Sequence, residues 1–323
     1  MKLSKSSIAI LIVAIVFGII ASAAAILPFL AERFYRDGFN LIQGRQYPAG
    51  ISKLKVATKL APFETQYKVE LGRGMEDYAK TLPSVQAKVM LEEIKPLYET
   101  LLDLDDRNPW YLNRMAAVYN DLATLDVEHQ SENQKVAEGY IRKAAAMDPN
   151  NPLFQLNLAY FLQNRGDLKE AKTYYERAIQ IDGRISEARF NLAALYLGEN
   201  KPDQALEQYL EILKNTPEMP GLLPAIGRLY LTQKQPQIAL PYLERNTQLF
   251  PFDRMGLILL AETYNQLRQT PKTIETLDLA VKRFPDDTQS RRNLIQLYRL
   301  NGQNAAADQQ EALLGAFLNT APK

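Results

Sequence analysis

Apolar and polar residues follow one another with a helical period from residue 31 to the C-terminus. The apolar positions recur three or four residues apart, in segments of a few turns that end at proline-containing turns. Five of these turns are LAPFE at 60–64, MDPNNP at 147–152, NTPEMP at 215–220, LFPFD at 249–253 and RFPDD at 283–287. Because proline cannot continue a helix and each apolar stripe has to be buried, the pattern predicts short amphipathic helices packed on one another.

The helical segments repeat with a period of 34 residues, which is the step between Tyr196, Tyr230, Tyr264 and Tyr298. We place eight repeat starts, with steps of 34, 44, 43, 34, 34, 34 and 34 residues, at Ala31, Thr65, Pro109, Pro152, Ser186, Pro220, Arg254 and Thr288. No single unit of this size can bury its apolar face alone. A fixed period of this length therefore predicts helix pairs that stack into a solenoid.

The residues at the repeated positions resemble those of the tetratricopeptide repeat (TPR) family. In the unit that starts at Pro152, the matching residues are Leu158, Ala159, Gly166, Ala171, Tyr175 and Ala178. The resemblance implies an all-α fold, a right-handed superhelical TPR solenoid of about eight helix pairs. Small residues let the two helices of a unit approach each other, and we assign this role to Gly38, Gly72, Ala116, Ala159, Ala193, Gly227 and Ala261.

Two units are about ten residues longer than the others, and the additional residues fall between their two helices. The segment 79–93 is expected to extend the second helix of its unit. The segment 125–134, which contains His129, is polar and is expected to form a loop. The solenoid then covers residues 31–319 and leaves a short tail at 320–323.

The N-terminal residues differ from the repeats. Residues 1–7 are short and polar, and residues 8–30 form an uncharged apolar run that is long enough to cross a bilayer as a helix. Two interpretations are open, a transmembrane anchor or a signal sequence cleaved at the small residues 21–23. The apolar run continues beyond that cleavage site, which favours the anchor.

The charges beside the apolar run predict its orientation. Lys2, Lys5 and the amino terminus precede the run, and the positive-inside rule places them in the cytoplasm. We therefore expect a single-pass protein of a bacterial inner membrane with its C-terminal domain in the periplasm. Small residues four apart allow membrane helices to pair, and in this run they are Ala14, Gly18 and Ser22.

The composition narrows the chemistry. The chain of 323 residues has 38 Lys and Arg, 37 Asp and Glu, no cysteine and a single histidine. This excludes thiol nucleophiles, Cys-ligated zinc and metal sites with two histidines. The near-zero net charge gives no general attraction to nucleic acid, and no phosphate-binding or nucleophile-elbow motif occurs. We expect a protein that is not an enzyme, needs no cofactor or metal and binds no nucleic acid.

The TPR resemblance also implies a concave groove, lined by the first helices of successive units, that binds peptides or partner helices. The face positions give this groove an apolar middle and a basic C-terminal end. Such a groove suits an amphipathic or acidic peptide or helix from a protein partner. The candidate groove residues are Leu156, Tyr160, Phe190, Leu197, Arg228, Leu231, Ile258, Arg292 and Arg299.

These features predict a membrane-anchored, extracytoplasmic TPR scaffold or adaptor that binds protein partners to assemble or stabilise an envelope complex. Three other functions remain open. The chain can be a structural subunit built permanently into a membrane complex, an accessory factor for polysaccharide export, or a cytoplasm-facing assembly or quality-control factor.

Overall fold

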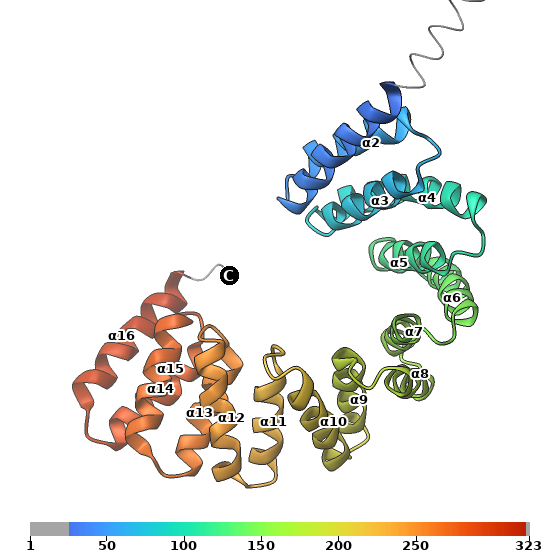
Figure 1. Ribbon diagram of the computed structural model, residues 1–323. Coiled ribbons are helices and arrows are strands. Elements are labelled where there is room, and N and C mark those ends of the chain that lie inside the picture. The colour runs from blue at the N-terminus through green and yellow to red at the C-terminus, as the bar shows by residue number, and fades with distance from the viewer. Residues whose placement is uncertain (1–25, 321–323) are drawn as a thin grey trace, which may run out of the picture. The chain divides into compact units, whose positions relative to one another are not determined.

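The computed structural model describes residues 26–320, which form sixteen helices: the helical residues 26–43 and the fifteen helices α2 to α16 (Figure 1). The predicted all-α architecture of paired helices is confirmed for this part of the chain. Within it, none of the helices combines the length and the hydropathy that a bilayer crossing requires. Most of the apolar run 8–30, including Ala14, Gly18 and Ser22, lies outside the described residues.

The helices divide into two compact units, and the first unit ends at Phe161. Consecutive helices from α2 to α6 pack on each other in this unit, and α7 begins in it. After the helical residues 26–43, its helices are α2 (Tyr47–Leu60), α3 (Thr65–Ala79), α4 (Ser84–Leu104), α5 (Pro109–Leu125), α6 (Gln130–Met147) and α7 (Pro152–Arg165).

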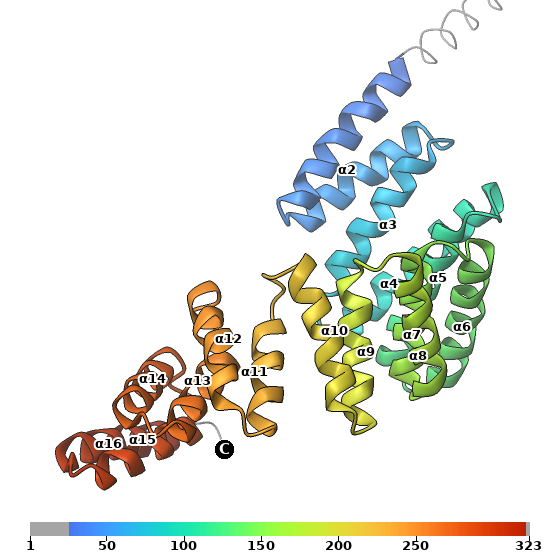
Figure 2. The same cartoon turned by 60° about the horizontal axis from the view of Figure 1, so that its bottom comes forward.

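The second unit begins at Leu162. Here too, from α8 to α16, each helix packs on the next one along the chain, and α11 also contacts α13. Figure 2 shows the same pairs from another direction. The helices are α8 (Leu168–Ile181), α9 (Ser186–Gly198), α10 (Pro202–Asn215), α11 (Leu222–Thr232), α12 (Pro236–Leu249), α13 (Arg254–Gln266), α14 (Thr270–Arg283), α15 (Thr288–Leu300) and α16 (Asn304–Thr320).

The predicted repeat starts agree closely with the helix starts. Six of them are the first residues of α3, α5, α7, α9, α13 and α15. The exception among the later repeats is α11, which begins at Leu222, two residues after the predicted Pro220. Gly221 precedes this helix with a left-handed backbone (φ 81°), so the helix starts later. In the first repeat, Ala31 lies inside the helical residues 26–43.

The two insertions have different outcomes. As predicted, the first one extends a second helix, and α4 has 21 residues against 14 in α8 and α10. The second is wrong in part, because the loop covers only 126–129 and α6 starts at Gln130. Polarity alone does not prevent a helix there, since the exposed first turn carries Glu132, which is favourable near the positive end of the helix dipole.

The small residues lie where the two helices of a pair approach. A Cβ atom on Gly38 would lie 2.9 Å from Cγ of Leu54, and one on Gly227 would lie 2.7 Å from Cγ of Leu243. Both leucines are fully buried. The alanines at the same repeat position, Ala116, Ala159, Ala193 and Ala261, are all buried too. The assigned role is therefore confirmed for these positions.

The turn within each pair of the second unit has a recurrent left-handed residue. Its φ is positive at Gly166, Asn200, Lys234, Arg268 and Gly302, which lie 34 residues apart. In each case the next amide donates to a carbonyl five residues earlier, as in Gln235 N to Tyr230 O at 2.8 Å. This is the Schellman arrangement that ends a helix. It gives successive pairs the same exit direction.

Candidate partner-binding site

First helices of the second unit form a hollow of about 290 Å³, which we call the arginine hollow. Its wall is mostly apolar, and the Phe190 ring packs on the Tyr209 ring with centroids 5.3 Å apart. The hollow is lined by Phe190, Leu197, Tyr209, Gly221, Pro224, Ala225, Arg228, Leu229, Asp253 and Met255. It therefore draws residues from α9, α10, α11 and the start of α13.

Arg228 is the cation of the arginine hollow. Its side chain is exposed, and no described residue forms an ion pair or hydrogen bond with it. The carboxylate at the other side of the hollow is already engaged, because Asp253 Oδ2 accepts a hydrogen bond from Asn246 Nδ2 at 2.8 Å. The guanidinium is thus available for an incoming carboxylate, which it binds with two parallel hydrogen bonds when the geometry allows.

Tyr209 forms part of the floor of this hollow. Only 3% of its surface is exposed, and its hydroxyl has no hydrogen-bond partner among the described residues. Burial raises the pKa of Tyr209, and the positive charge of Arg228 opposes that shift. The phenol therefore stays protonated at neutral pH and offers a donor to a bound segment.

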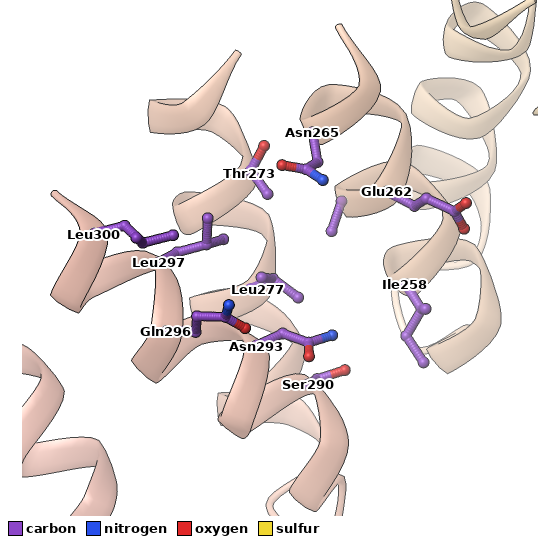
Figure 3. Close-up of a pocket in the computed structure, with 11 residues that line it drawn as sticks. Ile258, Glu262, Asn265, Thr273, Leu277, Ser290, Asn293, Gln296, Leu297 and Leu300 are labelled. Carbon is purple, nitrogen blue, oxygen red and sulfur yellow. The ribbon is translucent and has the colours of Figure 1, made fainter. Parts of the chain in front are cut away.

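A second hollow of about 480 Å³ lies between α13 and α15, and we call it the amide hollow. Figure 3 shows side chains of α13 on one side, those of α15 on the other, and Leu277 of α14 between them. Its lining includes three carboxamides, Asn265, Asn293 and Gln296, and one carboxylate, Glu262. Carboxamides donate and accept hydrogen bonds at once, so this hollow suits polar groups of a bound segment.

The predicted groove residues therefore separate into groups. Phe190, Leu197 and Arg228 come together in the arginine hollow. Ile258 lines the amide hollow. Leu156 and Tyr160 lie on α7 in the first unit, where Leu156 is half-buried and Tyr160 is 53% exposed.

Leu231 was expected on the groove surface but lies in the core. Only 6% of it is exposed, and it packs in a cluster with Leu243 and Leu260. Helix α11 is apolar almost all round, so its sequence does not mark one face as the surface. A partner cannot contact this side chain without displacing α12 or α13.

The predicted basic C-terminal end is also different in the structure. Arg299 pairs with Asp308 at 2.5 Å and with Glu311 at 3.2 Å, both from α16. Arg292 is exposed, but neither hollow includes it. The cation available beside an apolar hollow is therefore Arg228, and the C-terminal hollow is lined by amides.

Two contributors to the arginine hollow were not predicted, Asp253 and Met255. They belong to the turn and the first residues of α13, whereas the sequence analysis considered only the middle of each first helix. His129 hydrogen-bonds Asp126 through Nδ1 at 3.1 Å and has an exposed side chain. Among residues 26–320, no group of three or more His, Cys, Asp or Glu side chains is placed to hold a metal ion.

Helix pairs with a small residue at each close approach and a 34-residue step define a tetratricopeptide-repeat fold. Residues 153–218 match the family model described as tetratricopeptide repeat. The chain is also similar in fold to the solved structure of Pseudomonas aeruginosa pilF, with a TM-score of 0.51 and 20% identity over 65% of this chain and 95% of that one. The protein is thus a TPR repeat protein.

Curated relatives share the repeats over part of their length. Human protein O-mannosyl-transferase TMTC3 is 24% identical over 222 residues, which are 66% of this chain and 23% of that protein. Photosystem I assembly protein Ycf3 of Prochlorococcus marinus subsp. pastoris is 32% identical over 71 residues, 21% of this chain and 41% of that protein. The chain spans less than half the length of either relative.

Proposed function

We propose that the protein is a membrane-anchored scaffold that binds segments of partner proteins on the first-helix face of its second unit. The observation that carries the proposal is the arginine hollow, where Phe190 and Leu197 form an apolar wall beside the unpaired Arg228. Exposed apolar surface of this kind is typical of interaction sites. Because the chain has no cysteine and one histidine, it acts by binding, without catalysis of its own.

The hollow suits a segment with an apolar side chain next to an acidic one. An aromatic or branched aliphatic side chain fills the space between Phe190 and Met255, and the neighbouring carboxylate pairs with Arg228. The amide hollow then takes polar groups further along the same segment. An amphipathic helix or an extended acidic peptide provides this combination.

Peptide display tests this specificity. Random peptides are selected against the detergent-solubilised full chain and against the Arg228→Glu variant. We expect the native chain to enrich an apolar residue next to Asp or Glu, and Arg228→Glu to enrich Lys or Arg in place of the acid, because reversing the charge reverses the preferred partner.

Arg245→Glu is the matched control. Arg245 is exposed on α12, the second helix of the same repeat, and it lines neither hollow. This variant should enrich the same peptides as the native chain. If Arg228→Glu still enriches the acidic-apolar peptides, the arginine hollow is not the site.

The anchor and the location are further parts of the proposal. The apolar run 8–30 supports a single bilayer crossing, with the repeats on the outer side, where the scaffold assembles an envelope complex. Alkaline phosphatase fused after Lys323 should be active in cells, since it needs export. An inactive phosphatase fusion together with a fluorescent green-fluorescent-protein fusion would place the repeats in the cytoplasm instead.

A further inference from the structure

The turn between α2 and α3 exposes an aromatic ring that packs on nothing in the described structure. Phe63 is 87% exposed, the largest exposed fraction among the large apolar side chains of residues 26–320. It follows Pro62 in a turn that Lys68 Nζ closes by donating to the Pro62 carbonyl. A turn held in this way presents the ring outward at little cost in conformational entropy.

This turn lies at the same end of the first helix pair as residue 26. Figures 1 and 2 both show the α2–α3 turn beside the start of the described chain. The contacts agree, because Ala31, Phe34 and Tyr35 pack with Leu60 and Ala61 in one cluster. The Tyr67 hydroxyl also donates to Glu32 at 2.8 Å.

The level of the turn coincides with the expected headgroup layer. This layer extends about 5–7 Å beyond the hydrocarbon core on each side, which corresponds to roughly four residues of a helix that leaves the bilayer. If the apolar run ends at residue 30, these are residues 31–34, and the α2–α3 turn packs against them.

The exposed side chains around the turn fit a lipid surface. Ile26 is 54% exposed and Phe29 is 67% exposed, so the apolar character continues from the run to the turn. Arg33 and Lys59 are exposed at the same end of the pair. Aromatic rings at the headgroup level with cations beside them are typical of membrane interfaces.

We infer that Phe63 inserts into the lipid interface beside the apolar run and so fixes the first helix pair on the membrane surface. The inference rests on the proposed anchor, and its occupant is the bilayer itself. A rigid second contact would prevent the first pair from rotating freely about a single crossing helix.

Site-specific fluorescence tests this contact in the full chain. The chain has no cysteine, so each single cysteine variant carries one polarity-sensitive nitrobenzoxadiazole label. Phe63→Cys is reconstituted in phosphatidylethanolamine–phosphatidylglycerol vesicles that contain a lipid with a nitroxide high on its acyl chain. We expect a blue-shifted emission at position 63 and a loss of most of that emission when the nitroxide lipid is present.

Phe252→Cys is the matched control. Phe252 also follows a proline in an inter-repeat turn and is 77% exposed, but Arg283 lies over its ring at 5.5 Å and no apolar run adjoins it. Its label should remain unshifted and unquenched. Equal behaviour of positions 63 and 252 overturns the inference.

Ala14→Cys separates this inference from the anchor, because residue 14 lies in the apolar run. Quenching at position 14 without quenching at 63 overturns the lipid contact of Phe63 and leaves the anchor standing. Absence of quenching at 14 overturns the anchor and the inference together.

Discussion

The α3–α4 pair of the first unit and the α11–α12 pair of the second have the same close approach but different chemistry around it. Gly72 and Gly227 each lie seven residues after the predicted repeat start. A Cβ atom on Gly72 would lie 2.6 Å from the Tyr98 hydroxyl oxygen, and one on Gly227 would lie 2.7 Å from Cδ2 of Leu243. One glycine therefore faces a polar group and the other faces a methyl group.

The polar group belongs to a buried network that joins three helices. The Tyr98 hydroxyl donates to Glu76 Oε1 at 2.5 Å, and Arg114 donates to Glu76 Oε2 at 2.9 Å. Burial raises the pKa of Glu76, while Arg114 and the Tyr98 hydrogen bond oppose that shift. Leu243 has no such ties and lies in an apolar cluster of α11, α12 and α13.

The comparison shows that a glycine of the repeat pattern is constrained by its neighbour's freedom to move. A leucine can change its rotamer to make room for a methyl group. A tyrosine ring held by a buried carboxylate cannot move without breaking its hydrogen bond. The same repeat position should therefore tolerate substitution less well in the first unit.

The largest effect is expected for Gly72→Ala, because the new methyl group meets the Tyr98 hydroxyl. We expect a loss of about 2–3 kcal/mol in the free energy of unfolding, and about 1–2 kcal/mol for Gly227→Ala. Urea unfolding is followed by circular dichroism for the whole chain and by fluorescence of Trp110, the single tryptophan, for the first unit.

Gly139→Ala is the control for this pair of variants. Gly139 lies in α6 with no atom within 4 Å of a Cβ atom built on it. There the better helix propensity of alanine should stabilise the chain by about 0.5–1 kcal/mol. A greater loss for Gly227→Ala than for Gly72→Ala would contradict the role given to the buried network.

Tyr98→Phe removes the hydroxyl and leaves Glu76 with one donor fewer. We expect a loss of about 1–2 kcal/mol, since a buried acceptor loses its partner. In the double variant with Gly72→Ala, part of the clash disappears together with the hydroxyl oxygen. The two losses should therefore sum to more than the loss of the double variant in a double-mutant cycle, and strict additivity would show that the hydroxyl does not limit Gly72.

The smallest effect concerns the turns, which are regular in the second unit. Lys234 and Arg268 adopt left-handed backbones with φ of 59° and 56°, a conformation that favours glycine. Lys234→Gly and Arg268→Gly should each stabilise the chain by about 0.5–1 kcal/mol. Gly166→Ala, at the same position with φ of 89°, should destabilise it by a similar amount, and the melting temperatures measure both signs.

The sequence predicts the repeat boundaries well because the residues that set them are local. Proline at the first turn of a helix and polar residues just before it act over a few positions, which explains the agreement at Pro109, Pro152 and Arg254. Position α11 departs from the pattern because Gly221 adopts a left-handed backbone, and glycine allows that conformation without requiring it.

The site is predicted less well because it depends on contacts between repeats. The neutralisation of Arg299 requires knowing that α16 brings Asp308 and Glu311 beside it. Another example is the buried Arg291, which donates to the carbonyl of Val281 at 3.4 Å, as Gln155 does to that of Ala145 at 3.2 Å, each ten residues earlier. Polar residues at these positions read as surface residues in the sequence.

The central claim is that partner segments lie in the arginine hollow. The direct measurement is photocrosslinking of a fluorescent acidic-apolar peptide, selected by display, to the full chain with benzoylphenylalanine at position 197 or 238. Leu197 lines the hollow, whereas Ile238 is 45% exposed on α12 and lies outside it. We predict crosslinking at 197 that Arg228→Glu abolishes and none at 238; equal crosslinking at both positions, or crosslinking at 197 that survives Arg228→Glu, would contradict the account.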